Sequence, residues 1–274
     1  MQVQDETPRI PLARARIMGI AILISTITSC VAMAALVPVL PAMQAHFAGE
    51  PGAGFLVRFL ISLMGPVMIV GAPLGALLGE KFGQRRFVLF SMIVFGITGC
   101  VGYFVDDLYI IVASRIVMGL VLAAGGTILT TMVATYFVGA ERNKWLGYMG
   151  TAGMFFGVTV FPIAGWLGKF GWHMVFLAHA IAFPIAIVLA FGLPRDEPRR
   201  AAEVVQKGSE AAPASGLPWV LLATALACGM VMSSASLYAP YHASDAGIKD
   251  PGLIGVNMLA QTVTSAFKIG RAHV

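Results

Sequence analysis

Seven long apolar runs, separated mostly by short polar connections, limit what this chain can fold into more than any other feature. The runs lie at residues 17–40, 55–79, 87–105, 108–138, 145–168, 172–193 and 217–241. Each is long enough to cross the hydrocarbon core of a bilayer, which takes about 20 helical residues. The runs are continuous rather than alternating, and backbone polar groups must be paired in lipid, so helices are required rather than strands. The sequence predicts an all-α, polytopic membrane protein.

The composition excludes the soluble alternatives. Hydrophobic residues make up 58% of the 274 residues and charged residues only 11%, whereas a soluble domain has roughly 45–50% and about 25%. Disorder is excluded as well, because disordered segments have low hydrophobicity and high charge.

Basic residues are distributed unevenly among the connections. The N-terminal tail and the connections after the second, fourth and sixth runs contain Arg9, Arg14, Arg16, Lys81, Arg85, Arg86, Arg142, Lys144, Arg195, Arg199, Arg200 and Lys207. The alternate connections contain only Arg58, Lys169 and Lys249. By the positive-inside rule, residues 1–16 form a cytoplasmic tail. The net charge of +5 therefore reflects topology rather than nucleic-acid binding, and we expect a multi-pass protein of a bacterial-type plasma (inner) membrane.

A charged connection and an internal repeat divide the chain. Residues 194–216 are predicted to be a cytoplasmic linker between a six-helix N-terminal half at 17–193 and the start of a second half at 217–267. Pro51-Gly52 and Pro251-Gly252 each open an apolar run at an offset of about 200 residues. The first and seventh runs are predicted to end near Pro38 and Pro240.

The repeat predicts that the second half is truncated inside helix eight. It aligns Lys268 with Met68, in the middle of the second run, and Lys or Arg at that depth costs about 2.5–3.5 kcal/mol. Residues 269–274 resemble one translated frame of a common sequencing adapter. We hypothesise that residues 268–274 are foreign and that the full chain has about 400 residues, enough for twelve helices.

The connection after the second run has a characteristic spacing. It reads Ala76-Leu77-Leu78-Gly79-Glu80-Lys81-Phe82-Gly83-Gln84-Arg85-Arg86. This segment resembles the signature Gly-x-Leu-x-Asp-Arg-x-Gly-Arg-Arg between helices two and three of the major facilitator superfamily, although Gln84 replaces a basic residue. In that family the loop is a conformational latch against the opposite half. The resemblance therefore makes latch candidates of Gly79, Glu80, Lys81, Gly83, Arg85 and Arg86.

The fourth run contains an arginine. Arg115 and Gly119 resemble the family's Arg-x-x-Gln-Gly segment, with Met118 in place of Gln. Arg115 lies roughly 10 Å inside the run, where an arginine is expected to face a cavity or a partner, or else to extend toward the outer headgroups. Proton-coupled relatives link this Arg to proton movement, often alongside an acid in helix one, and residues 17–40 contain no acid. Arg115 and Gly119 are therefore candidate coupling or cavity residues, and the proton carrier stays open.

The fifth run contains regularly spaced small residues. Gly153, Gly157, Pro162 and Gly165 resemble the antiporter-associated motif Gly-x-x-x-Gly-Pro-x-x-Gly-Gly, although Phe161 and Trp166 replace two glycines. General packing of membrane helices also favours small residues at this spacing. The motif is therefore compatible with antiport without requiring it.

Other polar side chains inside the runs are few. His179 can titrate near neutral pH or pack through hydrogen bonds, and we include it among the coupling or cavity candidates. Hydroxyls in the first and seventh runs can line a cavity or bond between helices: Ser25, Thr26, Thr28, Ser29, Ser233, Ser234, Ser236 and Tyr238. Paired carboxylates within the runs, metal-spaced His/Cys clusters, a nucleotide-binding loop and a nucleophile elbow are missing. We therefore predict no enzyme, no cofactor and no metal.

Together these features are similar to those of major facilitator transporters, most of all the drug or sugar efflux proton antiporters. The resemblance implies two six-helix halves that rock around a site near the midplane, a small-molecule substrate, coupled protons and a monomer when full length. The alternatives are an uptake or facilitative transporter of the same family and, from a different class, a seven-helix receptor or an intramembrane enzyme. The receptor would place its N-terminus outside, and the enzyme would need catalytic groups that the runs lack.

Overall fold

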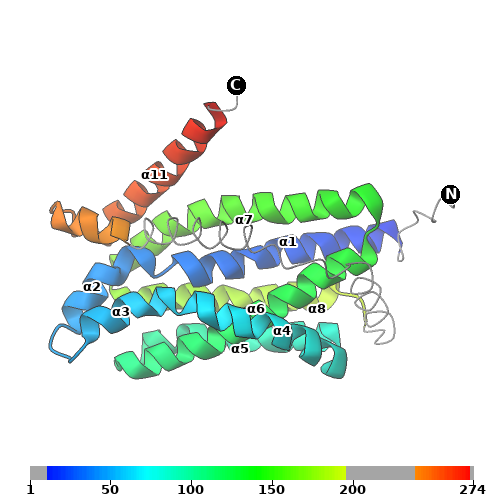
Figure 1. Cartoon of the computed structure of the whole chain (residues 1–274), viewed down its shortest axis with the longest axis horizontal. Helices are drawn as coiled ribbons and strands as arrows, with labels where there is room; N and C mark the ends of the chain where they lie inside the picture. Colours follow the sequence, from blue (N-terminus) through cyan, green and yellow to red (C-terminus); the bar gives the residue numbers. More distant parts are fainter. Residues whose placement is uncertain (1–10, 196–237, 272–274) are drawn as a thin grey trace, which may run out of the picture.

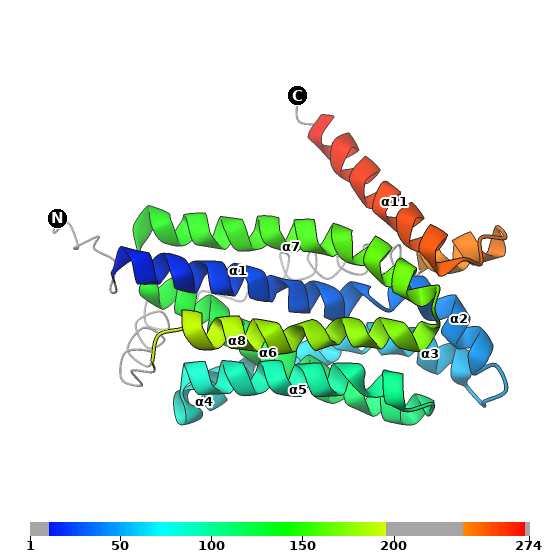
Figure 2. The same ribbon diagram turned by 180° about the vertical axis from the view of Figure 1, so that it is seen from behind.

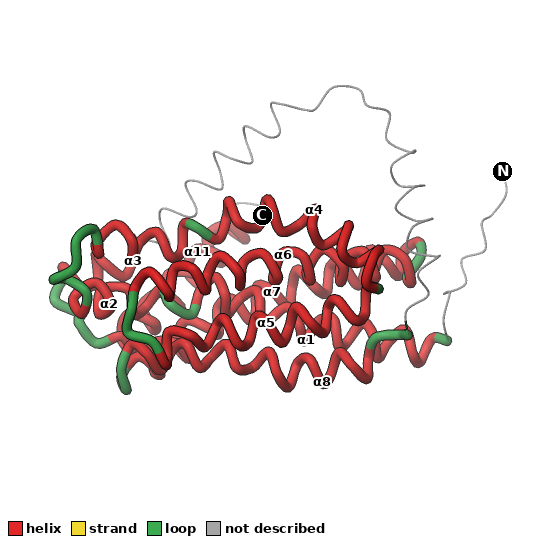
Figure 3. Tube along the Cα trace, turned by 90° about the horizontal axis from the view of Figure 1, so that it is seen from below, coloured by secondary structure: helices red, strands yellow, loops and turns green. Residues whose placement is uncertain are grey.

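The computed structural model describes residues 11–195 and 238–271, and this part of the chain is helical with short connections and no strand (Figure 3). Six segments are long and apolar enough to cross a membrane: Ala13–His46, Ala53–Phe82, Gln84–Phe104, Leu108–Tyr136, Gly139–Gly168 and Trp172–Gly192. The prediction of an all-α polytopic membrane fold is confirmed. Most of the predicted linker at 194–216 and of the run at 217–241 lies outside the described residues.

The segments form a bundle of roughly parallel and antiparallel helices (Figure 1). The first consists of α1 (Leu12–Ala34), the 3₁₀ helix η1 (Val37–Val39) and α2 (Leu40–His46), and the second of α3 (Ala53–Ser62) and α4 (Met64–Phe82). Then follow α5 (Gln84–Phe104), α6 (Leu108–Tyr136) and α7 (Gly139–Gly168). The sixth consists of the 3₁₀ helix η2 (Trp172–Ile181) and α8 (Ala182–Gly192). A helical stretch at 238–245 precedes α11 (Pro251–Arg271).

The predicted helix ends at Pro38 and Pro240 are wrong. The chain stays helical from η1 through α2 to His46, because Pro38 and Pro41 lie in the first turns of these helices, where a missing N–H costs no bond. Pro240 likewise lies within the helical stretch 238–245.

The helix α7 begins at Gly139, six residues before the apolar run that starts at residue 145. Its first turns are charged but helical, and Glu141 pairs with Lys144 at 3.6 Å. Hydropathy alone detects only the apolar part of such a helix.

Small residues bring the helices of the bundle close together. On α4, a Cβ atom at Gly71 would lie 2.9 Å from the Cβ of Ala123 on α6, and one at Gly75 would lie 2.6 Å from the Cα of Ala124. The backbones of α4 and α6 therefore almost touch, which only glycine permits. The helix α5 lies beside α8 in Figure 2 and receives side chains from the sixth segment against Gly96, Gly99 and Gly102.

The two ends of the bundle differ in charge. We call one end the basic end, because it contains Arg14, Arg16, Lys81, Arg85, Arg86, Arg142, Lys144 and Arg195. It includes the start of α1, the α4–α5 turn and the start of α7 (right in Figure 1). The opposite end contains α2 and the start of α11. From there, α11 diverges from α7 as it runs toward the basic end (Figures 1 and 2).

Candidate functional site

Arg115 is buried in the middle of the bundle. Its side chain is 1% exposed, so extension toward the headgroups, one of the two sequence expectations, is wrong. Its Nη1 lies 3.0 Å from Nε2 of His179, and its guanidinium carbon lies 4.9 Å from the ring centroid of Phe176. The structure thus brings together two of the predicted coupling residues, Arg115 on α6 and His179 on η2.

The contacts of His179 determine which ring nitrogen holds its proton. The guanidinium can only donate, so Nε2 of His179 must accept. Nδ1, which lies 3.0 Å from the carbonyl oxygen of Phe176, then donates to that oxygen. A neutral imidazole with its proton on Nδ1 satisfies both contacts, and protonation of Nε2 would place two donors against each other.

The surroundings of this pair explain its position. The side chain of His179 packs directly against Gly99 of α5, where no Cβ would fit. His179 also lies in a 3₁₀ helix of ten residues, and 3₁₀ runs longer than three or four residues are uncommon and often mark a hinge. Gly119 faces α4, since a Cβ there would lie 2.8 Å from Cγ1 of Val67.

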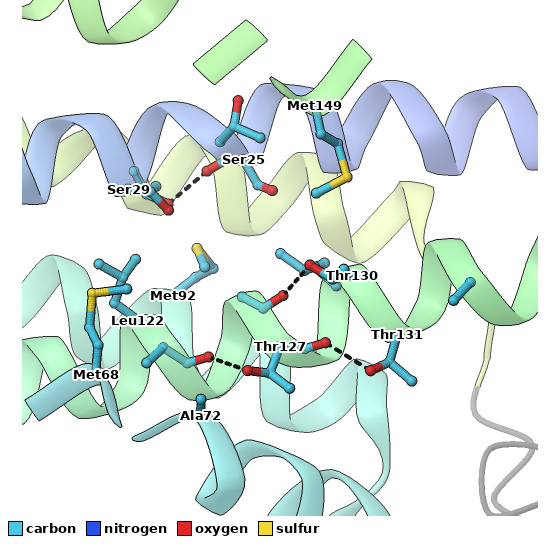
Figure 4. A pocket seen from close by; sticks show the side chains of 16 residues that line it. Ser25, Ser29, Met68, Ala72, Met92, Leu122, Thr127, Thr130, Thr131 and Met149 are labelled. Atoms are coloured by element: carbon cyan, nitrogen blue, oxygen red, sulfur yellow. Dashed lines mark hydrogen bonds between the residues drawn. The ribbon is translucent and has the colours of Figure 1, made fainter. Parts of the chain in front are cut away.

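A cavity of about 550 Å³ lies between α1 and α6 (Figure 4). Its lining consists of Ser25, Thr26, Thr28, Ser29, Met68, Ala72, Met92, Leu122, Ala123, Gly126, Thr127, Leu129, Thr130, Thr131, Ala134 and Met149. The four hydroxyls expected from the first run are therefore in the lining. The α6 threonines were not predicted from the sequence, although their spacing of three and four residues places them on one helix face. Arg115, Gly119 and His179 are not among these residues.

The candidate latch segment contains a connection of a single residue. Only Gly83, with φ of +89°, separates α4 from α5, a backbone conformation that favours glycine. Glu80 and Lys81 lie in the last turn of α4, and Arg85 and Arg86 in the first turn of α5. Nη2 of Arg85 donates to the carbonyl of Ala190 near the end of α8. The candidate latch is therefore a helix-to-helix corner.

The four residues of the helix-five motif have different surroundings on α7. A Cβ at Gly165 would lie 3.1 Å from the Cα of Gly255, so α7 and α11 cross in close contact there. Pro162 lies inside the helix. At Gly153 and Gly157 a Cβ would meet no described atom within 4 Å. Among these three glycines, only Gly165 lies where a Cβ would clash with a described residue of another helix.

Charged side chains join elements at the opposite end. Nζ of Lys169 lies 3.2 Å from Oδ2 of Asp250, and Oδ1 of Asp250 accepts from the backbone N–H of Gly252 at 2.8 Å. The Gly252 N–H, together with Lys169, holds the pKa of Asp250 below its ordinary value. His46 and Asp106 pair at 2.9 Å. In residues 11–195 and 238–271, no group of three or more His, Cys, Asp and Glu side chains could hold a metal ion.

Comparison with known proteins identifies the family of this bundle. The profile of the Major Facilitator Superfamily matches residues 22–271. The chain belongs to the major facilitator superfamily. It is 25% identical over 193 residues to the class H tetracycline resistance protein of Pasteurella multocida, a match covering 70% of this chain and 48% of that protein. It is 26% identical over 149 residues to the bacillibactin exporter of Bacillus subtilis, covering 52% of this chain and 36% of that protein.

Solved structures of the superfamily have the same fold. The inward-open xylose transporter XylE from E. coli matches with a TM-score of 0.66 at 17% identity, covering 94% of this chain and 69% of that chain. A D-xylose-proton symporter matches with a TM-score of 0.64 at 15% identity, covering 91% and 65%. The chain spans about half or less of the length of the curated relatives it matches. As a member of this superfamily with six described membrane-length helices, the chain is a multi-pass membrane protein.

Proposed function

We propose that this major facilitator chain supplies one half, and the start of the other, of an exporter that exchanges small drug- or sugar-like molecules for protons. In this proposal, residues 17–193 are the N-terminal half, 194–216 the cytoplasmic linker and 217–267 the start of the second half. The N-terminus is cytoplasmic, and the full-length protein acts as a monomer in a bacterial-type inner membrane.

The observation that carries the proposal is the position of the cavity relative to the contacts between the two parts. The contacts of α11 and its preceding stretch with the N-terminal part lie at the opposite end, through Gly165 and Gly255, Lys169 and Asp250, and the apolar cluster of Val37, Ala243, Ile254 and Met258. The cavity lies between α1 and α6, and α11 diverges toward the basic end (Figure 1). A hinge-like contact at one end of a bundle with a cavity suits rocking of two halves around a midplane site.

Proton coupling rests on the buried pair. The first run has no acid, whereas Arg115 and His179 meet at 3.0 Å in the bundle interior. Ionisable groups at this depth are costly and are retained for function. We therefore propose that His179 binds the proton and that this breaks its contact with Arg115 and shifts η2. Arg115 senses the proton because it loses its acceptor on His179.

We infer the direction of transport from the related proteins. Those named above are a resistance protein and an exporter, which favours efflux. The alternative is uptake, supported by the structural match to a D-xylose-proton symporter and by the two missing glycines of the helix-five motif.

Transport in inverted membrane vesicles tests the proposal. Vesicles that contain the product of the complete gene are given an acidic lumen, and tetracycline and D-xylose serve as probes. We expect tetracycline to accumulate in the lumen and a protonophore to abolish this accumulation. Accumulation that the protonophore leaves unchanged would contradict exchange for protons, and xylose movement without a pH gradient would favour the facilitative alternative.

Variants separate the coupling pair from general damage. Arg115→Ala should reduce proton-driven accumulation at least tenfold, and Arg115→Lys should restore little, because a lysine cannot reproduce the planar guanidinium contact. Arg142→Ala, at an exposed position of the basic end, is the control and should transport normally. Normal coupling in Arg115→Ala would remove this residue from the mechanism.

A further inference from the structure

We propose that the cavity between α1 and α6 binds uncharged amphipathic molecules that present hydrogen-bond donors, such as phenols and alcohols, and rejects anions. This inference rests on the proposed function in one respect, that the cavity is the substrate site of the transporter. Its ligand class follows from the hydrogen bonds that the lining side chains already make.

Hydroxyl side chains line the cavity on two sides in the same pattern. Seven of the lining residues are Ser or Thr. On α1, Ser25, Thr28 and Ser29 are spaced by three and four residues, and on α6 the same spacing is repeated by Thr127, Thr130 and Thr131. Residues at this spacing share one face of a helix. Figure 4 shows the labelled hydroxyls of α1 on one side of the cavity and those of α6 on the other.

Six of these seven hydroxyls donate their only proton to a carbonyl of their own helix. The bonds run from Ser25 to Ile22 at 2.6 Å, Thr26 to Leu23 at 2.7 Å, Thr28 to Ser25 at 2.7 Å, Thr127 to Ala123 at 2.9 Å, Thr130 to Gly126 at 3.0 Å and Thr131 to Thr127 at 2.9 Å. A hydroxyl has one donor and two acceptor lone pairs. Once the proton is used, the group offers the cavity acceptors alone.

The rest of the lining is neutral and soft. None of its described side chains is charged. Met68, Met92 and Met149 add polarizable sulfur from three further helices, and thioether sulfur packs well against aromatic rings. Arg115 is not part of the lining and contacts His179 and Phe176 instead.

This chemistry selects ligands by what they donate. An anion would bring further acceptors against six hydroxyls that offer only acceptors, and among the lining residues only the hydroxyl of Ser29 would be left to replace its hydration. A neutral ligand with O–H or N–H groups meets lone pairs on both walls. The cavity volume lies within the usual range for drug-sized ligands, about 300–1,000 Å³.

Four related probes test the assignment by equilibrium binding to the product of the complete gene, purified in detergent. They are bisphenol A, which has two phenol donors, its dimethyl ether, which has none, diphenolic acid, which adds a carboxylate, and the methyl ester of that acid. We expect bisphenol A and the ester to bind with similar affinity. The ether should bind roughly 2–10-fold more weakly for each lost hydrogen bond, and diphenolic acid at neutral pH at least tenfold more weakly than its ester.

Matched threonine variants locate the effect. Thr127→Val and Thr130→Val should each weaken bisphenol A binding about 2–10-fold and leave the ether unchanged. Thr135→Val is the control, because Thr135 lies on the same helix and donates to Thr131 at 2.8 Å in the same way but is not part of the lining. A loss of folding would alter the control as well.

Three results would contradict the proposed ligand class. Equal affinity for bisphenol A and its ether, tighter binding of the acid than of its ester, or no binding of any probe would overturn the assignment. The measurement needs no ion gradient. A transporter that fails to export against a proton gradient but keeps this binding order would therefore refute the proposed antiport and leave the ligand class standing.

Discussion

The helices α6 and α7 are almost equally long, 29 and 30 residues, but they are packed very differently. Over their most apolar windows, 56% of α6 is buried inside the described structure and only 17% of α7. The mean hydropathy of these windows, 2.1 and 1.4, marks both as membrane spans. Hydropathy thus identifies a span but does not tell whether its neighbours are lipid or protein.

The neighbours of the two helices explain the difference. α6 is enclosed by α4 and α5, with close backbone approaches at Gly71 and Gly75. α7 packs along α1, where Sγ of Cys30 donates to the carbonyl of Gly153 at 3.3 Å, and meets α11 at its end. The large exposed side chains of α7 include Met154 and Phe155. Within the described residues, α6 therefore lies in the interior of the bundle and α7 at its surface.

The largest difference in stability is expected between two glycine-to-alanine variants, one where α4 packs on α6 and one on α7. In Gly75→Ala, the new Cβ would overlap the backbone of Ala124, and such overpacking costs about 1–3 kcal/mol. In Gly157→Ala, the Cβ meets no described atom, and the helix gains about 0.5–1 kcal/mol in propensity. Thermal unfolding in detergent, followed by circular dichroism, measures the difference. Equal midpoints for the two variants would show that the described packing of α4 on α6 does not hold.

Replacing Arg115 should lower the free energy of unfolding by less than the difference between the two glycine variants. It should lower it by more than the removal of a surface charge does. Arg115→Met keeps much of the side-chain volume and leaves Nε2 of His179 without its donor, a loss of about 1–3 kcal/mol. Lys144→Met on α7 removes one partner of an exposed ion pair, which is worth about 0–1 kcal/mol. Unfolding midpoints again compare the two. A Lys144 variant as unstable as the Arg115 variant would refute the difference in burial between the helices.

A third substitution acts where α7 does make a close contact. In Gly165→Ala, the added Cβ meets the carbonyl oxygen of Pro251 and the Cα of Gly255. We expect α11 to move away while the N-terminal bundle keeps its unfolding midpoint, because α11 packs on α7 from one side. Spin labels at the exposed positions Trp166 and Leu253, on a cysteine-free background, report the separation. Gly153→Ala is the control, and an unchanged distance in Gly165→Ala would contradict the crossing.

The sequence predicted the fold because hydropathy is local. Six spans and the charge bias of the connections can be read within about 20 residues. The ends of the helices were harder to predict from the sequence. The charged first turns of α7 and the helical prolines at Pro38 and Pro240 depend on caps and neighbours, to which average hydropathy is insensitive.

The candidate site was predicted as single residues and not as a constellation. Arg115 and His179 were each selected, but their contact depends on Gly99, a third residue that lets η2 approach α5. The α6 threonines follow helical spacing, but only the fold shows that they face Ser25 and Ser29 across a cavity. Such pairings are set by tertiary packing, which no local sequence pattern encodes.

The smallest effect is expected at the ion pair between Lys169 and Asp250, because both side chains are well exposed. The Gly252 N–H and Lys169 favour the charged carboxylate, so the folded pKa of Asp250 lies below its ordinary value of 3.8. The contact is therefore fully present above that value and is lost only as the pH falls through the lowered pKa. The distance between the labels at Trp166 and Leu253 should stay constant from about pH 8 to pH 5.

Substitutions at Asp250 test the same contact. Asp250→Asn keeps an acceptor at the start of α11 and should broaden this distance slightly, and Asp250→Ala should broaden it more. Asp245→Asn, at an exposed position, should leave it unchanged. A distance that already broadens between pH 7 and pH 5 would show that a group other than Asp250 controls the contact of α7 with α11.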